Sequence, residues 1–447
     1  MISLVYEKSD SGPSSSKGFR LVTDNGTQFF LAPKYLNEIR SNQSLRFEPV
    51  VKKLRVRLTL ITGNIVDPMI QIADSVVRNT FTDNKGMENH TNFDFKFNYS
   101  ITSTLANKYK TVWHEISLTD PILNIVACLS SQVFVGKELS QNPEWIENIL
   151  QYTVDASDAS EALHLVPKNL RPFAAHFSPA VRRLRKRVVK TRTLFHSVLD
   201  KTRIQGEKSV QENLGIMSWF EECSKGRTYD PAATHLNLAF VSISSTSDMI
   251  TQLIYDLCGR EELVTELRDE IISVLGEEGW SKKGLYKLQL LDSVMKESQR
   301  LKPGIVGLQR YAEKDTVLSE GTFIPKGSFL IVSCHHMFTQ NFGTYDNAGE
   351  FDGHRFYNIR QSGAQEQWTQ FAAASEKHVG FGYGQHACPG RFFATNQIKI
   401  IMCHFLLNYD FNFVDGLPRK PCPRGIGLQA NPSAMISIRR RQSKVDL

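Results

Sequence analysis

Cys388 lies in a short segment, Phe381–Gly390, that contains three glycines and precedes a predicted helix. Glycine lets a backbone adopt positive φ and come close to a flat ligand. A helix that begins near Pro389 would put its positive end beside the sulfur, which lowers a thiol pKa and favours the thiolate. The segment therefore favours a reactive or ligand-binding cysteine; a buried structural cysteine at a turn is the alternative.

Two charged groups farther upstream have the spacing of an internal network. Glu297 and Arg300 stand three positions apart in the predicted helix 284–301, so their side chains share one side and can pair. Arg355 follows in the segment Phe351–Phe356. Arginine suits a buried carboxylate network because its planar fork bonds bidentately. An exposed ion pair between Glu297 and Arg300 is the alternative interpretation.

The spacing of apolar residues predicts a mainly α-helical chain. The clearest helix is expected over 231–258, where apolar residues repeat at alternating spacings of four and three. Asp230 can cap this helix and Pro231 suits its first turn. Further helices are predicted over 51–83, 105–165, 261–275, 284–301 and 389–408.

Short strands accompany these helices. A hairpin is expected over 19–31, around the turn Asp24–Gly26. Residues 322–324 and 328–332 are expected to form a second strand pair across a Pro-Lys-Gly turn. Two segments are expected to be irregular, 203–210 and 338–370.

Composition limits the classes of protein that fit. The chain has 447 residues, of which 41% are hydrophobic, enough for a large core. Its seven cysteines are scattered without a C-x-x-C pair, which argues against a disulfide framework or a zinc ribbon and favours a reducing, intracellular compartment. No apolar run approaches the ~20 residues that span a bilayer, so we expect no membrane anchor in this chain.

A basic stretch, Arg182–Arg192, accounts for part of the net charge of +7. Such a stretch can face nucleic acid, anionic lipid or an acidic protein, and a solvated helix face is the plainer interpretation. We expect no nucleic-acid partner, whereas peripheral contact with a membrane surface stays open.

The cysteine segment resembles the F-x-x-G-x-x-x-C-x-G signature of the cytochrome P-450 family, and residues 391–394 are similar to those of its fungal members. Glu297 and Arg300 resemble the family's E-x-x-R motif, and Arg355 the arginine that completes a Glu–Arg–Arg network. The order of these features along the chain is also that of the family. The signature positions are matched by Phe381, Gly384, Cys388 and Gly390.

The resemblance implies a cytochrome P-450 fold, mainly α with small β-sheets, as a single domain over 1–447 that is shortened around 45–58. It implies haem b with Cys388 as the axial ligand to iron, O₂, and electrons from NADPH through a cytochrome P-450 reductase. The implied enzyme is a monooxygenase of fungal secondary metabolism that acts on a hydrophobic small molecule, with terpenoids or indole-diterpenes as candidates. The alternative is a catalytically impaired haem-binding protein of the same fold. The family's usual location is the surface of the endoplasmic reticulum.

The resemblance also assigns roles to single residues. Arg310 and His386 match positions that bind the haem carboxylates. A predicted helix near 52–60 should supply one more cation, with Arg57 or Arg55 as the candidates. Ser245 and Thr246 stand where the family delivers protons from its long central helix, although a serine replaces the usual acid. Serines that only bond back to the helix backbone are the alternative there.

Overall fold

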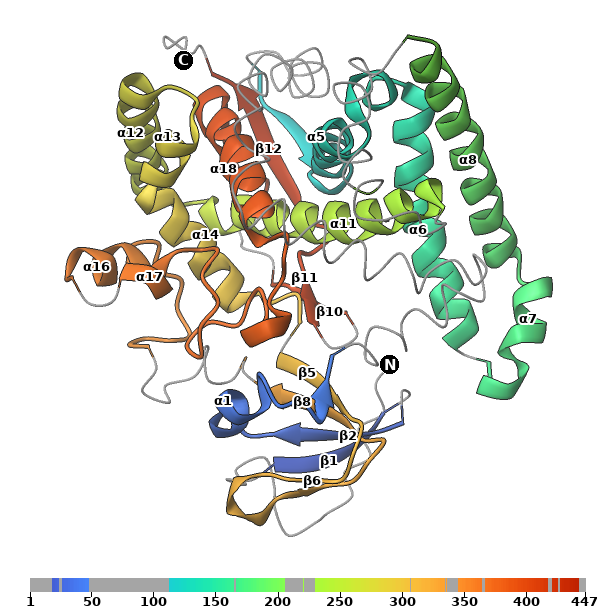
Figure 1. Ribbon diagram of the computed structural model, residues 1–447. Coiled ribbons are helices and arrows are strands. Elements are labelled where there is room, and N and C mark those ends of the chain that lie inside the picture. The colour runs from blue at the N-terminus through green and yellow to red at the C-terminus, as the bar shows by residue number, and fades with distance from the viewer. Residues whose placement is uncertain are drawn as a thin grey trace. The chain divides into compact units, whose positions relative to one another are not determined.

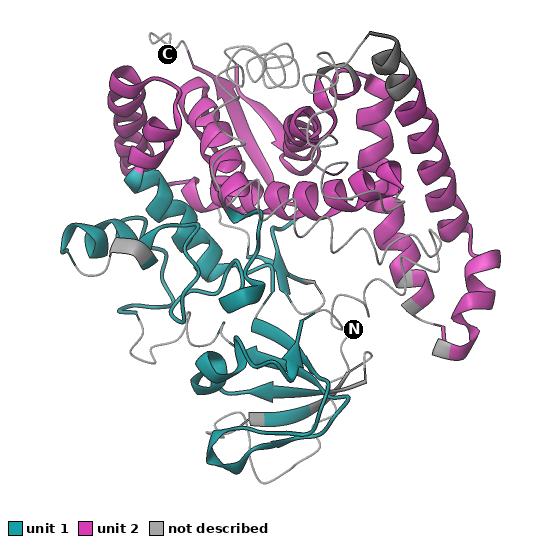
Figure 2. Ribbon diagram, in the orientation of Figure 1, with its two compact units in different colours: residues 1–54, 289–391, 420–431 teal, residues 55–288, 392–419, 432–447 magenta. Residues whose placement is uncertain are grey.

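The computed structural model describes most of the chain and divides it into two compact units (Figures 1 and 2). Unit 1 comprises residues 1–54, 289–391 and 420–431, and unit 2 comprises the rest. The single domain expected over 1–447 stays a prediction, and most of the segment 45–58 lies outside the described residues. These are 18–23, 26–47, 112–164, 166–205, 220, 230–305, 307–333, 335, 345–363, 366–416, 420–424 and 427–441.

Unit 1 is built on a five-stranded sheet with the strand order β1-β2-β8-β5-β3. Its strands are β1 Gly18–Thr23, β2 Gly26–Leu31, β3 Leu45–Arg46, β5 Gly307–Ala312 and β8 Phe329–Ser333. Two small pairs are β6 Thr316–Val317 with β7 Phe323–Ile324, and β10 Cys422–Arg424 with β11 Gly427–Gln429. The helices are α1 Leu36–Ile39, α14 Gln289–Leu301, α16 Arg355–Gln361 and α17 Glu366–Thr369, with 3-10 turns η1 Pro33–Tyr35, η5 Ser319–Gly321 and η6 Gly384–His386.

The predicted N-terminal hairpin is confirmed, because β1 and β2 pair antiparallel from Gly18 opposite Leu31 to Thr23 opposite Gly26. The second predicted strand pair is wrong. Strand β8 pairs with β2 and β5 instead, and β7 pairs with β6. The reason lies in its apolar centre, Leu330–Val332, which is buried throughout and suits an inner strand rather than a surface hairpin.

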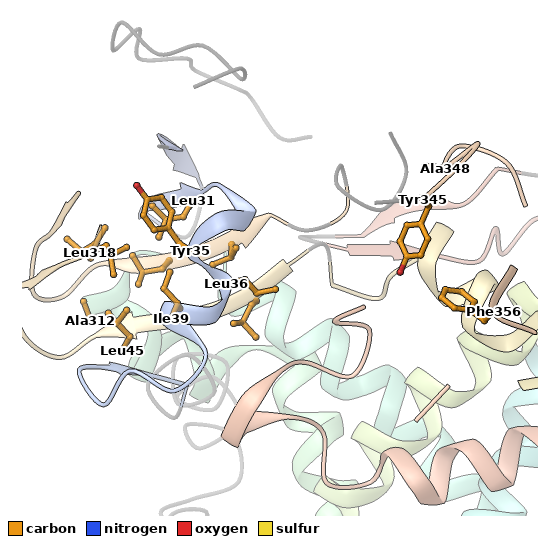
Figure 3. Packing of buried hydrophobic residues seen from close by; sticks show 14 residues of the cluster. Leu31, Tyr35, Leu36, Ile39, Leu45, Ala312, Leu318, Tyr345, Ala348 and Phe356 are labelled. Atoms are coloured by element: carbon orange, nitrogen blue, oxygen red, sulfur yellow. The ribbon is translucent and has the colours of Figure 1, made fainter. Parts of the chain in front are cut away.

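A cluster of buried side chains joins the sheet of unit 1 to the helices beside it (Figure 3). Tyr35, Leu36 and Ile39 reach this cluster from η1 and α1, and each is at most 2% exposed. Full burial of one such side chain contributes about 1.5–3 kcal/mol. The cluster thereby fixes residues 33–39 against β5 and β8, the strands that come before the cysteine segment in the chain.

Unit 2 contains most of the long helices and a three-stranded sheet in the order β4-β12-β9. The strands are β4 His114–Ser117, β9 Tyr409–Phe413 and β12 Met435–Arg440. The helices are α5 Thr119–Ser140, α6 Pro143–His164, α7 Arg171–Phe177, α8 Pro179–Gln205, α11 Pro231–Leu257, α12 Glu261–Glu278, α13 Lys282–Lys287 and α18 Arg391–Asn408, with the 3-10 turn η4 Lys168–Leu170. Short sheets and dominant helices confirm the predicted mainly α class.

Helix α11 is the long central helix predicted from the apolar spacing, and it packs against α5, α6 and α8 (Figure 1). Asp230 caps it as expected, because its Oδ1 accepts a hydrogen bond from the Ala233 N–H at 3.2 Å. His235 is buried with one ring nitrogen 2.8 Å from the Pro231 carbonyl and the other 3.0 Å from the Phe134 carbonyl of α5. Burial lowers the pKa of His235 to about 4, so the imidazole is neutral at pH 7.

The basic stretch lies on α8, and several of its arginines form ion pairs within unit 2. Asp155 of α6 accepts from Arg183 at 2.9 Å and from Arg187 at 3.2 Å. Arg192 pairs with Asp230 at 2.7 Å. These arginines therefore hold neighbouring helices together.

Other element boundaries differ from the prediction. The helix expected over 284–301 is broken at Leu288, whose ψ of 77° is not helical, so α13 and α14 are separate. The segment 338–370, expected to be irregular, contains α16 and α17. Helix α8 continues to Gln205, into the expected loop 203–210. The predicted helix 51–83 lies outside the described residues.

Within the part of the chain that the structure describes, no helix combines the length and apolar character needed to cross a membrane.

Candidate functional site

The loop that carries Cys388 is a tight turn built on two glycines. Gly382 and Gly384 both have a φ of +76°, which only glycine adopts without strain. The Cys388 N–H donates to the Phe381 carbonyl oxygen at 2.7 Å. Helix α18 then starts at Arg391, slightly later than predicted. The turn therefore presents the cysteine just before a helix N-terminus.

The Cys388 thiol is half-buried, and burial raises its pKa. A hydrogen bond from the Gly390 backbone N–H and the charge of Arg391 oppose this increase without overcoming it. The lowered pKa expected from the helix end is thus wrong for the free thiol, because desolvation of the thiolate outweighs the helix terminus. A metal ion at the sulfur would deprotonate it outright. Without a cation at the sulfur, the Cys388 thiol is therefore a weak nucleophile.

The residues around the sulfur are accessible to a ligand. No residue from Val379 to Arg391 is buried, although the stretch includes Phe381 and Ala387. A Cβ at Gly390 would meet only the Cys388 sulfur, at 4.0 Å, among the described residues. A haem has the flat shape and apolar faces to cover such a surface, and its iron would lie at the sulfur.

Arg310 is a buried cation on β5 with no acidic partner among the described residues. Its side chain donates to the carbonyl oxygens of Arg40 at 3.1 Å and Tyr383 at 3.4 Å, and its Nε has no partner within the same described part of the chain. Burial alone lowers the pKa of Arg310, to about 10. A buried guanidinium without a counter-charge is unfavourable. A carboxylate such as a haem propionate is its natural complement.

His386 lies near Arg310 through a shared aromatic ring. The His386 ring is 5.8 Å from the ring of Phe47, and the Arg310 guanidinium carbon is 5.9 Å from the same Phe47 ring. The structure thus gathers two of the three residues expected to bind haem carboxylates. The third, Arg57, lies outside the described residues.

The sequence alone does not identify Tyr383 of this loop or Arg40, which contacts it, as candidate site residues. The Arg40 guanidinium lies 4.7 Å from the centre of the Tyr383 ring and donates to the Tyr383 hydroxyl oxygen at 2.5 Å. That hydroxyl in turn donates to the Asn37 side chain at 3.1 Å. The only sequence signal for Tyr383 is its position inside the cysteine segment. No local pattern identifies Arg40.

Glu297, Arg300 and Arg355 form a buried network in unit 1. The Glu297 carboxylate accepts two bonds from Arg300, at 2.7 and 2.8 Å, and two from Arg355 at 3.1 Å. The side chains of Glu297 and Arg300 are 0% exposed, so the pair is not a surface ion pair. Both arginines also donate to backbone carbonyl oxygens within Asp346–Glu350. The network therefore ties α14 to the segment before α16.

We expect Gly384→Ala to destabilise the protein by about 2–4 kcal/mol, from left-handed backbone strain and overpacking together. A Cβ at Gly384 would lie 2.9 Å from the Arg40 carbonyl oxygen. Gly363→Ala is the matched control, since Gly363 has a φ of +71° and a Cβ there would meet no described atom within 4 Å. Urea unfolding of both variants measures the difference, and equal losses would contradict the close approach of Arg40.

Ser245 and Thr246 lie on different sides of α11. Thr246 is buried, whereas Ser245 is exposed and its hydroxyl donates to the Val241 carbonyl oxygen at 2.8 Å. Ser245 belongs to a strip with Leu238, Val241 and Ser242 that is not buried, on a helix that is otherwise largely buried. Val241 is 66% exposed. Unit 2 thus leaves open a face of α11 on which Leu238 and Val241 lie among polar residues, namely Asn237, Ser242, Ser244, Ser245 and Asp248.

Comparison with known proteins agrees with this geometry. A family model described as Cytochrome P450 matches residues 86–436. The chain is 39% identical to cytochrome P450 monooxygenase adrA of Penicillium rubens, over 97% of this chain and 85% of that protein. It is 37% identical to cytochrome P450 monooxygenase nodR of Hypoxylon pulicicidum, over 96% and 85%. It is 35% identical to cytochrome P450 monooxygenase 1 of Gibberella fujikuroi, over 97% and 99%.

Proposed function

The chain belongs to the cytochrome P450 family and is a haem-dependent monooxygenase of the fungal secondary-metabolism type, in which we propose that Cys388 is the axial ligand of the iron. When bound, the haem activates O₂ with electrons that come from NADPH through a reductase. The observation that carries the assignment of Cys388 is the half-buried thiol on a glycine turn, beside open space at Gly390. The relatives described above are named monooxygenases, and nothing supports the impaired alternative.

We propose that Arg310 binds one haem propionate and that His386 binds near it. The support is the buried guanidinium of Arg310, which has no acidic partner among the described residues, and the Phe47 ring that both side chains approach. Phe381 and Gly384 shape the loop, and Gly390 leaves the space beside the sulfur open. Arg57 is the proposed third cation.

The test of the function uses purified haem-bound protein with a cytochrome P450 reductase, NADPH and isotopically labelled O₂. We expect a reduced, carbon monoxide-bound spectrum of a thiolate-ligated haem, and products that carry one labelled oxygen atom. A panel of hydrophobic compounds that includes terpenoids and indole-diterpenes addresses the substrate. NADPH consumption without any oxygenated product across the panel would favour an impaired protein.

We propose a hydrophobic substrate of the terpenoid or indole-diterpene class. Its support in this chain is the open face of α11, where Leu238 and Val241 offer aliphatic surface to an apolar carbon skeleton, and the neighbouring serines offer hydroxyl groups to its polar substituents.

We propose that the Ser245 hydroxyl passes protons during oxygen activation, with Thr246 as a second hydroxyl on the same helix. Because Ser245 Oγ donates to the Val241 carbonyl, its lone pairs can accept a hydrogen bond from water. Ser245→Ala is expected to lower product formed per NADPH, by roughly 10²-fold if the hydroxyl acts as a proton donor. Ser157→Ala is the control, because the Ser157 hydroxyl of α6 back-bonds to the Thr153 carbonyl oxygen in the same way. Unchanged coupling in Ser245→Ala would exclude the role.

We propose that the protein contacts the surface of the endoplasmic reticulum through α7 and the turn η4 before it. Leu170, Phe173 and Phe177 are 56%, 70% and 63% exposed, and the two phenylalanine rings lie 4.9 Å apart. The basic helix α8 follows directly, which suits an anionic lipid surface.

Co-sedimentation with liposomes that contain anionic lipid tests this contact. Phe173→Ser with Phe177→Ser is expected to reduce the bound fraction several-fold, because burial of apolar side chains drives interfacial binding. Phe323→Ser removes an exposed phenylalanine of unit 1 and is the control. Binding that survives the double substitution would reject α7 as the contact.

A further inference from the structure

Helix α14 carries a second set of buried polar side chains besides the Glu297 network. Asp292, Lys296 and Gln299 recur at spacings of four and three, so they share one side of the helix. Their exposures are 4%, 0% and 8%. Buried polar groups of this kind are normally satisfied by specific partners. Here the partners come from residues 368–380, except that Asp292 also pairs with Arg360 of α16 at 3.4 Å.

Lys296 holds three backbone carbonyl oxygens at once. Its Nζ donates to Trp368 at 2.8 Å, to Gln370 at 2.7 Å and to Ala373 at 3.3 Å. Burial lowers the pKa of Lys296 to about 7. Its protonated form has three donors and no acceptor, so the three carbonyls match the full capacity of that form. The Phe356 ring covers the amine at 5.3 Å. Lys296 therefore fixes the shape of the segment 368–373.

The neighbours of Lys296 hold the same stretch at two further points. Asp292 Oδ2 accepts from the Phe371 N–H at 2.7 Å. Gln299 Oε1 lies 2.9 Å from His378 Nε2. A Cβ at Gly380 would overlap the same Gln299 oxygen, so the chain passes directly over this side chain.

The held segment connects to the cysteine by two contacts. The buried Phe371 ring meets the Phe381 ring edge-on, with centroids 5.0 Å apart. The carbonyl oxygen of Phe381 accepts the Cys388 N–H at 2.7 Å. A shift of the segment 368–373 would therefore move Phe381, and with it the sulfur.

We propose that Lys296 is a positioning residue for the thiolate ligand, which it holds in register by binding the carbonyls of Trp368, Gln370 and Ala373. It acts separately from the Glu297 network, whose arginines bind carbonyls of Asp346–Glu350. The inference rests on the proposed role of Cys388 as the iron ligand.

The test compares Lys296→Met with Lys399→Met in the haem-bound protein. Lys399 is also a buried lysine whose Nζ donates to carbonyls, those of Leu285 and Leu288, which lie outside the segment 368–380. We expect Lys296→Met to release haem to apomyoglobin at least about tenfold faster than Lys399→Met, or about 1.4 kcal/mol. Its reduced, carbon monoxide-bound spectrum should also shift toward the form that has lost the thiolate, at equal thermal stability of the two variants.

Lys296→Gln keeps two amide donors and is expected to restore much of the thiolate spectrum. If Lys296→Met binds haem with an unaltered spectrum and release rate, the positioning role is wrong. If Cys388→Ala itself keeps the thiolate spectrum, the proposed function fails instead, so the two failures are distinguishable.

Hydrogen exchange in the wild-type protein gives an answer without any variant. We expect urea-induced loss of the thiolate spectrum to coincide with exchange of the Phe371 amide, which Asp292 protects. Loss of the thiolate while that amide stays protected would overturn the proposal.

Discussion

Replacement of Cys388 by alanine is expected to abolish oxygen insertion, a loss of at least roughly 10⁶-fold, the lower range of enzymatic rate enhancement. The methyl group cannot bind iron, and the thiolate is the ligand that favours O–O cleavage. The reduced, carbon monoxide-bound spectrum of Cys388→Ala should therefore lack the band of a thiolate-ligated haem. Product formation with NADPH and reductase gives the second readout.

The matched control is Cys422→Ala, because Cys422 is another half-buried free cysteine of unit 1, on β10. It should keep both the spectrum and the activity. A thiolate spectrum that survives in Cys388→Ala and disappears in Cys422→Ala would show that Cys422 of β10 is the iron ligand.

Glu297→Gln should cost about 3–5 kcal/mol of stability, as expected when one partner of a buried ion network is removed. The Glu297 carboxylate pairs with both Arg300 and Arg355. The neutral amide would remove this negative charge from beside two buried guanidinium groups. It would also present an N–H₂ group to arginine donors, which cannot accept it. The expected outcome is little haem-bound protein and a much lower midpoint of urea unfolding.

Glu313→Gln provides the comparison, since Glu313 pairs with Arg46 at 3.7 Å on the surface of the same unit. Their side chains are 38% and 50% exposed, and such a pair is worth less than about 1 kcal/mol. Similar losses in Glu297→Gln and Glu313→Gln would show that burial does not govern the network.

Local patterns in the sequence were sufficient to predict the features that depend only on residues close together in the chain. The glycines before Cys388 predict a tight turn because only glycine adopts positive φ without strain, and Gly382 and Gly384 do so. Glu297 and Arg300 share a side of α14 because helix geometry repeats every 3.6 residues. The Asp230 cap follows from the same local chemistry.

Longer-range pairings could not be predicted from the sequence, because they depend on which segments pack together. Strand β8 matched a local hairpin pattern, yet its apolar centre is buried in an inner strand between β2 and β5. The sequence gives no sign that Lys296 is special, because its three carbonyl partners come from the distant segment 368–373. Arg40 contacts Tyr383 of the cysteine loop although most of the sequence separates the two residues.

The sequence by itself determined the order of the chemical groups and the turn that presents Cys388. Only the tertiary structure decided the electrostatics of that turn. Burial raises the pKa of the Cys388 thiol, against the lowering that its place before a helix predicts, because desolvation depends on every atom packed nearby. For the same reason, only the folded protein shows that Arg310 is buried without an acidic partner among the described residues, where a propionate would fit.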